Sequence, residues 1–258
     1  MKVIEYTPTN YPSDLTDGQW ELIEQYFPQG QHSEHHKRSL INAVLYLKDN
    51  GRAIPHDYPP WSTVHSFYFR ARISGLWDRI LDVLVKKKRV KAGRSETPSY
   101  GIIDSQSVKT LYASDERGID GGKLVKGRKR HIVVDIMGNL LSVVVHAANI
   151  HDTKSGINPA KIAFEKYPTI KKFCGDEGYR KSFEEAVASE LGLSVDISEK
   201  IVPGWAVIAE RWIVERTFAW WGYSRRLSSK DYEISTHSAE TMCEISHIHT
   251  LLRSLAKA

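Results

Sequence analysis

Two aspartates follow short apolar runs in the same manner, in Gly101-Ile102-Ile103-Asp104 and in Phe173-Cys174-Gly175-Asp176. Each run predicts a buried strand with a carboxylate at its carboxyl end, where ligands gather in open sheets. If the strands are neighbours, the two carboxylates repel each other unless they share a cation. Hard carboxylate oxygens suit Mg²⁺, which retains waters and accepts a substrate phosphate. On spacing alone, an equally good interpretation is that each aspartate caps the turn after its strand.

A third acid, Glu215, lies in the segment Arg211–Phe218, which predicts a helix that is apolar around much of its circumference. This glutamate therefore need not lie on a plain solvated face. From the residues alone, an ion pair with Arg211 one turn earlier is the better explanation. Asp135 and Asp152 are rival acids of lower weight, because the first precedes a hairpin turn and the second suits a helix cap.

The elements that must position these acids change character along the chain. The first third predicts helices over residues 16–27, 37–50, 62–75 and from 76, and short helices with tight breaks are typical of a helix-turn-helix unit. The basic segment Lys86–Arg94 and the polar stretch after it place a domain boundary at residue 95. We therefore expect a helical domain over 1–95 and a second domain over 96–258.

From Tyr100 onward, short apolar runs replace the helical period. We expect an α/β (α+β) fold, a mixed sheet with covering helices. The expected strands are 100–103, 131–136, 140–146, 170–175 and 193–197, with a turn at 137–139, and the expected helices are 152–164, 182–191 and a long one past Gly204.

Composition restricts the class of protein further. The 258 residues carry a formal net charge of +5 that is clustered rather than even, so nucleic acid is the first partner to consider. No stretch is apolar enough to span a bilayer and no signal peptide is evident, so we expect a cytoplasmic protein with no membrane partner. The two cysteines lack a partner motif, and the histidines at 32, 35, 36, 247 and 249 lack zinc-ligand spacing, so we expect those histidines on the solvated surface.

Several motifs together resemble the signatures of bacterial insertion-sequence DDE transposases, and the match covers essentially the whole chain. These motifs are Ile103–Lys109, Lys126–His131, Gly175–Tyr179 and Arg211–Phe218. Pro59–Val64 also resembles the helical domain before the catalytic core in the subgroup typified by insertion sequence five, within the insertion sequence four/five superfamily.

The resemblance implies a ribonuclease-H-like catalytic domain in which Asp104, Asp176 and Glu215 are the catalytic and metal-binding triad. The implied cofactor is two Mg²⁺ ions, with Mn²⁺ expected to substitute. One ion would activate a water, and later a DNA 3′-hydroxyl, while the other stabilises the leaving oxygen. The 39 positions from Asp176 to Glu215 (215 − 176 = 39) predict a compact core without a long insertion.

The implied partner is double-stranded DNA, as the terminal inverted repeats of an element and as target DNA, bound by a homodimer within the bacterial nucleoid. In some relatives a Tyr and a basic residue assist at positions that are Ile208 and Gly222 here, so we expect Arg225 or Arg226 to replace them. Stacking by Trp220 and Trp221 is possible, but we expect both in the core. The predicted DNA contacts are Lys109, Lys123, Lys126, Arg128, Lys129, Arg130, Arg211, Arg225, Arg226 and Lys230, and Ser62, His65 and Arg70 in the helical domain.

Two other functions stay open, and so does a purely structural explanation of the basic residues. The glycines around Lys123–Arg130 would let that backbone approach a phosphate chain, although a solvated loop is the common alternative. The helical domain could equally bind phosphates or another protomer. A stand-alone metal-dependent nuclease and a catalytically silent DNA-binding regulator are the alternatives to a transposase.

Overall fold

Four helices build the N-terminal part of the chain in this computed structural model, which describes residues 5–27, 34–198 and 211–256. They are α1 (Asp17–Glu21), α2 (Lys37–Asn50), α3 (Trp61–Ile73) and α4 (Leu76–Lys91), with a short 3-10 turn, η1 (Glu24–Tyr26), after α1. Thr16 caps α1 in a reciprocal capping box with Gln19. Gly51, with φ of 62°, ends α2 in the left-handed conformation. The three later predicted helices are confirmed, whereas the first, predicted over residues 16–27, ends at Glu21 and is followed only by the 3-10 turn.

Two boundaries in this region differ from the prediction. Helix α3 begins at Trp61 directly after Pro60, one residue before the predicted start at residue 62. Helix α4 continues to Lys91 and so includes most of the basic segment Lys86–Arg94, which the sequence analysis used to place the domain boundary. The helix is stabilised by its buried apolar face, which includes Ile80, Leu84 and Val85, and the basic residues of the segment therefore lie on a helix.

The second part of the chain contains a six-stranded mixed sheet. Its strands are β1 (Tyr100–Lys109), β2 (Gly118–Asp120), β3 (Val125–Val134), β4 (Leu140–Ala147), β5 (Lys172–Asp176) and β6 (Ser194–Ser198). The order is β2-β3-β1-β5-β6, and β4 also pairs with β3. Strand β3 is antiparallel to both β1 and β4, whereas β5 is parallel to both β1 and β6.

Strands β1 and β3 are longer than the apolar runs that predicted them. They pair from Ile102↔Val134 to Lys109↔Gly127, because polar and charged residues continue the ladder after the apolar ones end. The short strand β2 was not predicted. The hairpin turn was: Gly138, with φ of 80°, lies between β3 and β4.

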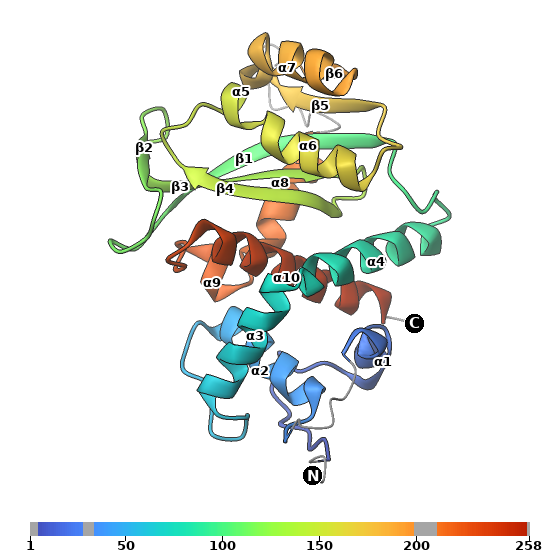
Figure 1. The fold of residues 1–258 in the computed structure, drawn as a ribbon, viewed down its shortest axis with the longest axis vertical. Helices are drawn as coiled ribbons and strands as arrows, with labels where there is room; N and C mark the ends of the chain where they lie inside the picture. The colour runs from blue at the N-terminus through green and yellow to red at the C-terminus, as the bar shows by residue number, and fades with distance from the viewer. Residues whose placement is uncertain (1–4, 28–33, 199–210, 257–258) are drawn as a thin grey trace.

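Helices cover both faces of the sheet (Figure 1). On one face lie α5 (Asp152–Ser155), α6 (Ile157–Lys166) and α7 (Ser182–Leu191). The expected helix 152–164 is thus two helices that meet at Gly156, and His151 rather than Asp152 caps the first. On the other face lie α4, α8 (Arg211–Trp221) and α10 (Thr236–Leu255), with the one-turn helix α9 (Arg225–Ser228) between α8 and α10.

The long helix α10, which the sequence did not predict, joins the two parts of the chain. It packs against α4, contacts α2 and covers β4, so buried apolar side chains form one cluster from Leu15 to Leu252. The architecture is a mixed α/β fold of the ribonuclease-H-like kind with an N-terminal helical region. The predicted start of a helix past Gly204, and Ile208, lie outside the described residues. In the described ranges, no helix is long and apolar enough to cross a membrane.

Candidate active site

Asp104 and Asp176 lie side by side on two parallel strands. The parallel register pairs Ile102 with Cys174, and two further residues along each strand reach Asp104 and Asp176. Both line one small hollow with Ser198 and Val214. Asp176 ends its strand as predicted, but Asp104 lies in the middle of β1, because β1 continues to Lys109 against β3. The expected meeting of the two carboxylates nevertheless holds.

Each of the two carboxylates also accepts a local backbone hydrogen bond. Asp176 Oδ1 accepts from Gly178 N at 2.8 Å and caps the 3-10 turn η2 (Glu177–Tyr179). Asp104 Oδ1 accepts from Ser105 N at 2.7 Å. The turn-capping interpretation is therefore right for Asp176. It does not compete with metal binding, because an ionised carboxylate has about four lone-pair positions.

Glu215 reaches this region through helix α8. Val214, the residue before it, lines the hollow, and α8 contacts β1. The Glu215 side chain is exposed, and within the described ranges no three His, Cys, Asp or Glu side chains are close enough to hold a metal ion. The structure thus brings Asp104 and Asp176 together and places the helix of Glu215 beside them without closing a three-acid cluster. The side chain of Arg211, its expected ion-pair partner, lies outside the described residues.

Side chains on α8 fasten the helix to the hairpin between β3 and β4. Thr217 Oγ1 donates to Gly138 O at 2.9 Å, and Arg216 Nη2 donates to Met137 O at 2.9 Å. The Arg216 guanidinium also lies 4.3 Å from the ring centroid of Trp212 and 4.9 Å from that of Trp220. Trp221 is fully buried, as expected, whereas Trp220 is partly exposed. These contacts set the rotation of α8 and hence the position of Glu215.

A buried polar network lies behind the two aspartates. Tyr179 Oη lies 2.7 Å from His131 Nε2, and His131 Nδ1 lies 3.2 Å from Ser155 Oγ. Burial lowers the pKa of His131 to about 3. Burial, and then the charges of Asp104, Asp152 and Asp176, raise the pKa of Tyr179 well above its ordinary value. Both groups are therefore neutral at physiological pH.

The sequence did not single out His131 and Tyr179, although each ends one of the recognised motifs. Their meeting depends on the sheet order, which puts the turn after β5 within reach of β3 across β1. The only sequence signal was their place in the motifs.

The two rival acids have structural partners. Asp152 accepts from Ser105 Oγ at 2.8 Å and from Lys129 Nζ at 2.9 Å. Burial alone would raise the pKa of Asp152, but these two donors outweigh burial and the pKa is lowered. Asp135 accepts from the backbone of the hairpin and forms a buried ion pair with Arg89.

Three of the expected DNA contacts are inside the protein, which corrects the prediction of a basic surface loop. Arg128 and Arg130 are fully buried and Lys129 nearly so, because β3 is covered on both faces. Arg128 pairs with Asp231 at 3.1 Å, and Arg130 donates to Leu227 O at 2.7 Å. Lys129 is held by Asp152. Arg128 and Lys129 are paired with acids inside the fold, whereas Arg130 Nε and Nη2 have no hydrogen-bond partner among the described residues. Because all three side chains are buried, they are not DNA contacts in this conformation.

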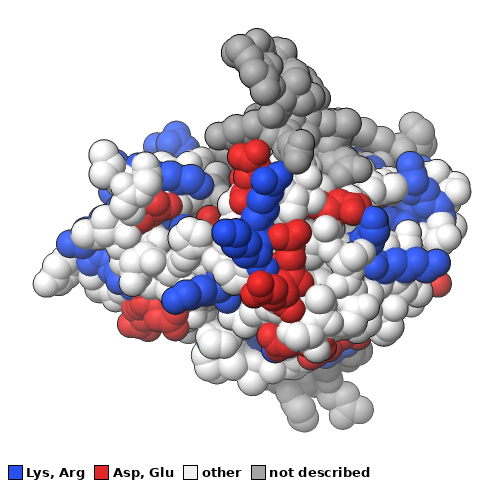
Figure 2. Space-filling model, turned by 90° about the horizontal axis from the view of Figure 1, so that it is seen from above, with Lys and Arg blue, Asp and Glu red and all other residues white. Residues whose placement is uncertain are grey.

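The other expected DNA contacts that the structure describes are at the surface. Arg226 is partly exposed and pairs with Glu233, and Arg211 has no described side chain. On the face over α7 and β6, cationic and anionic side chains alternate, so this face is not a basic field (Figure 2). The exposed residues are Lys109, Lys123, Lys126, Arg225, Lys230, Ser62, His65 and Arg70.

The histidines expected at the surface are mostly structural. His247 and His249 are buried on α10, where His247 Nε2 accepts from Leu140 N at 3.0 Å. His36 caps α2, and His32 lies outside the described residues. The prediction of a solvated surface was wrong for His247 and His249, because α10 is packed on several sides.

A ribonuclease-H-like sheet with paired aspartates on neighbouring strands, preceded by a helical region, is consistent with a DDE-type catalytic domain. The chain belongs to the family described as Transposase DDE domain, which it matches over residues 95–251, more than half of its length. Residues 15–81 match a second family model, described as "Putative transposase of IS4/5 family". A comparison with curated proteins gave no match.

Proposed function

We propose that this transposase binds the ends of an insertion sequence, cuts DNA strands there and joins them to target DNA. The observation that carries the proposal is the hollow shared by Asp104 and Asp176, with the residue before Glu215 in its wall. The two carboxylates lie on adjoining parallel strands and line the same hollow, so a cation shared between them would offset their mutual repulsion.

The same residues fit a divalent metal, and the family generally uses one. Carboxylate oxygens are the ligands that Mg²⁺ prefers, and Mn²⁺ accepts the same set. We propose that Asp104, Asp176 and Glu215 hold two such ions. When bound, they supply activation of a water or a DNA 3′-hydroxyl and stabilisation of the leaving oxygen. The fold positions the three acids, because β1, β5 and α8 each present one of them to the scissile phosphate.

We further propose that the partner is double-stranded DNA, first as the terminal inverted repeats and then as the target. Two ends must be brought together, so the working form is a homodimer on DNA. We also propose that the protein belongs to the subgroup typified by insertion sequence five. The helical region, with Ser62, His65 and Arg70 exposed along α3, supports recognition of the ends.

The test uses labelled duplexes that carry the ends of the parent element, with Mg²⁺ or Mn²⁺. Asp104→Asn, Asp176→Asn and Glu215→Gln should each lower end-specific cleavage about a thousandfold or more while DNA binding persists. Glu190→Gln is the matched control, because Glu190 is a carboxylate on α7 that pairs with Lys161. Its cleavage should equal that of the wild type.

The other outcomes separate the alternatives. Full cleavage by Asp104→Asn would remove the proposed mechanism. Degradation of DNA without regard to the element ends would support a stand-alone nuclease, and binding without any cleavage by the wild type would support a regulator.

A further inference from the structure

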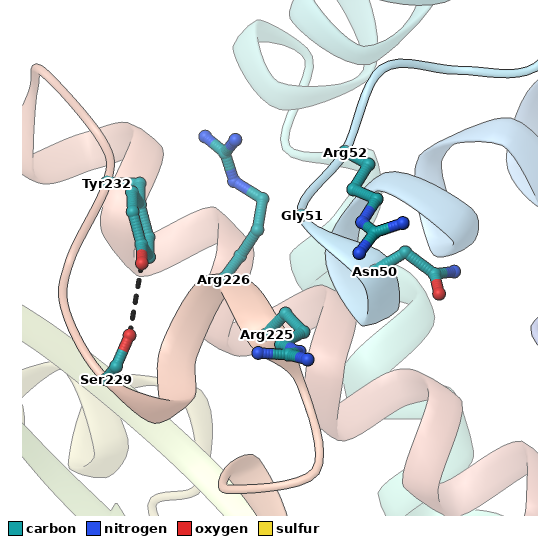
Figure 3. Close-up of a pocket in the computed structure, with 7 residues that line it drawn as sticks. All are labelled: Asn50, Gly51, Arg52, Arg225, Arg226, Ser229 and Tyr232. Atoms are coloured by element: carbon teal, nitrogen blue, oxygen red, sulfur yellow. Dashed lines mark hydrogen bonds between the residues drawn. The ribbon is translucent and has the colours of Figure 1, made fainter.

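A pocket of about 250 Å³ lies where the end of α2 meets α9, away from the paired aspartates (Figure 3). Arg52 comes from the segment after α2, and Arg225 and Arg226 come from α9, so two distant parts of the chain contribute to it. Its described lining residues are Asn50, Gly51, Arg52, Arg225, Arg226, Ser229 and Tyr232.

The charge of this pocket is only partly compensated. Arg226 is paired, because its Nε donates to Glu233 Oε1 at 2.9 Å. Arg52 and Arg225 are exposed, and within the described ranges neither guanidinium forms a hydrogen bond or an ion pair. None of the described lining residues is acidic. The guanidinium groups of Arg52 and Arg225 therefore line one pocket with hydrogen-bond donors that no described residue accepts from.

The backbone holds these two arginines close together. Gly51 has a φ of 62°, and a Cβ at this position would lie 3.3 Å from the Cβ of Arg225. A glycine here lets α9 pack closely on the end of α2 and keeps the left-handed backbone free of strain. Ser229 Oγ lies 3.1 Å from Tyr232 Oη, so two hydroxyls also border the pocket. The pocket is consequently a product of the packing of α2 against α9.

We infer that this pocket binds a phosphate group of the DNA backbone, and that the side chains of Arg52 and Arg225 contact the phosphate oxygens. The planar fork of a guanidinium matches two phosphate oxygens, and a phosphate neutralises both unpaired charges. Helix α9 follows α8 after three residues (Gly222, Tyr223 and Ser224), so the pocket and Glu215 are on connected helices. The choice of DNA as the source of the phosphate rests on the proposed function.

The test measures affinity for an element-end duplex over a series of salt concentrations, without metal so that cleavage does not interfere. Arg52→Ala and Arg225→Ala should each weaken binding roughly tenfold and reduce the slope of log affinity against log salt by about one. Lys161→Ala is the control, because it removes one partly exposed cation from α6, which is paired with Glu190, and should change neither quantity. Arg52→Lys and Arg225→Lys should keep the slope but lose part of the affinity.

The outcomes distinguish this inference from the proposed function. If both alanine variants bind DNA with the affinity and slope of Lys161→Ala, the inference is overturned, whatever the cleavage assay shows. If the variants lose affinity but the wild type cuts no element end, only the proposed function fails. A second arm uses inorganic phosphate: stabilisation of the wild type against heat, absent in Arg52→Ala, together with unchanged DNA affinity, would assign the pocket to free phosphate and overturn DNA as the source.

Discussion

The hydroxyl of Tyr179 lies 2.7 Å from Nε2 of His131, and this contact ties the turn after Asp176 to strand β3. Tyr179 is the last residue of η2, which begins directly after Asp176. His131 pairs with Ser105, the neighbour of Asp104, on β1. The hydrogen bond therefore links the turn next to Asp176 to the strand that pairs with the backbone next to Asp104. Both Tyr179 and His131 are fully buried.

Tyr179→Phe should loosen the turn that carries Asp176. The variant leaves His131 Nε2 buried without its partner, which costs about 1–3 kcal/mol of stability. We also expect cleavage to require a higher Mg²⁺ concentration, because Asp176 is held less firmly. Tyr167→Phe is the matched control: Tyr167 is equally buried, but its hydroxyl bonds to Asp82 at 2.7 Å, on α4. An equal shift in the metal requirement of both variants would contradict a positioning role for Tyr179.

The buried histidines should make the protein sensitive to acid. Burial lowers the pKa of both His131 and His247 to about 3, whereas an unfolded histidine titrates near 6.5. Between pH 6.5 and 3 the unfolded state therefore binds more protons than the folded state. The free energy of unfolding accordingly falls as pH is lowered through this window, by up to about 1.4 kcal/mol per pH unit for each histidine.

His247→Gln should flatten this dependence, because the amide oxygen can still accept from Leu140 N and the side chain does not titrate. Urea unfolding at several pH values measures the effect, with exposed His65→Gln as the control. A slope in His247→Gln equal to that of the wild type would show that His247 does not contribute to it.

Arg89 and Asp135 hold helix α4 to the hairpin after β3. Both are buried, and Arg89 Nε also donates to Ser95 O at 2.8 Å. Arg89→Ala leaves the Asp135 carboxylate without its cation, so we expect a loss of about 3–5 kcal/mol in the free energy of unfolding. Lys86→Ala, which removes a more exposed i, i+4 ion pair with Asp82 on the same helix, should cost below about 1 kcal/mol. Similar denaturation midpoints for the two variants would refute the assignment.

The sequence predicted those elements whose signals are local. Thr16 and Gln19 are close enough in the chain to reveal a capping box, and Gly51 after an apolar helix reveals its end. That Asp104 and Asp176 each follow a buried apolar run was also predictable, but their meeting required the two strands to be neighbours, which only the fold shows. Helix α10 was missed because buried polar residues such as Ser246 and His247 interrupt its apolar pattern.

The positions of the cations could not be predicted in the same way. Arg128 looks like a surface charge in a glycine-rich basic run, but its partner Asp231 is distant in sequence. A charged residue enters a core only where partners surround it, and only the fold reveals those partners. The same limit applies to the Tyr179 and His131 bond, which needs three strands in the right order.

Lys126 and Arg128, two residues apart on β3, should respond to alanine in opposite ways. Lys126 is exposed, so Lys126→Ala should leave the free energy of unfolding within about 0.5 kcal/mol and, if this surface meets DNA, lower the salt slope of binding by about one. Arg128 is fully buried and donates to Asp231 and to the backbone of Glu233, so Arg128→Ala should cost about 3–5 kcal/mol. Thermal unfolding and DNA titration of the two purified variants measure both effects. A stable Arg128→Ala protein with weakened DNA binding would return Arg128 to the DNA surface and refute its structural role.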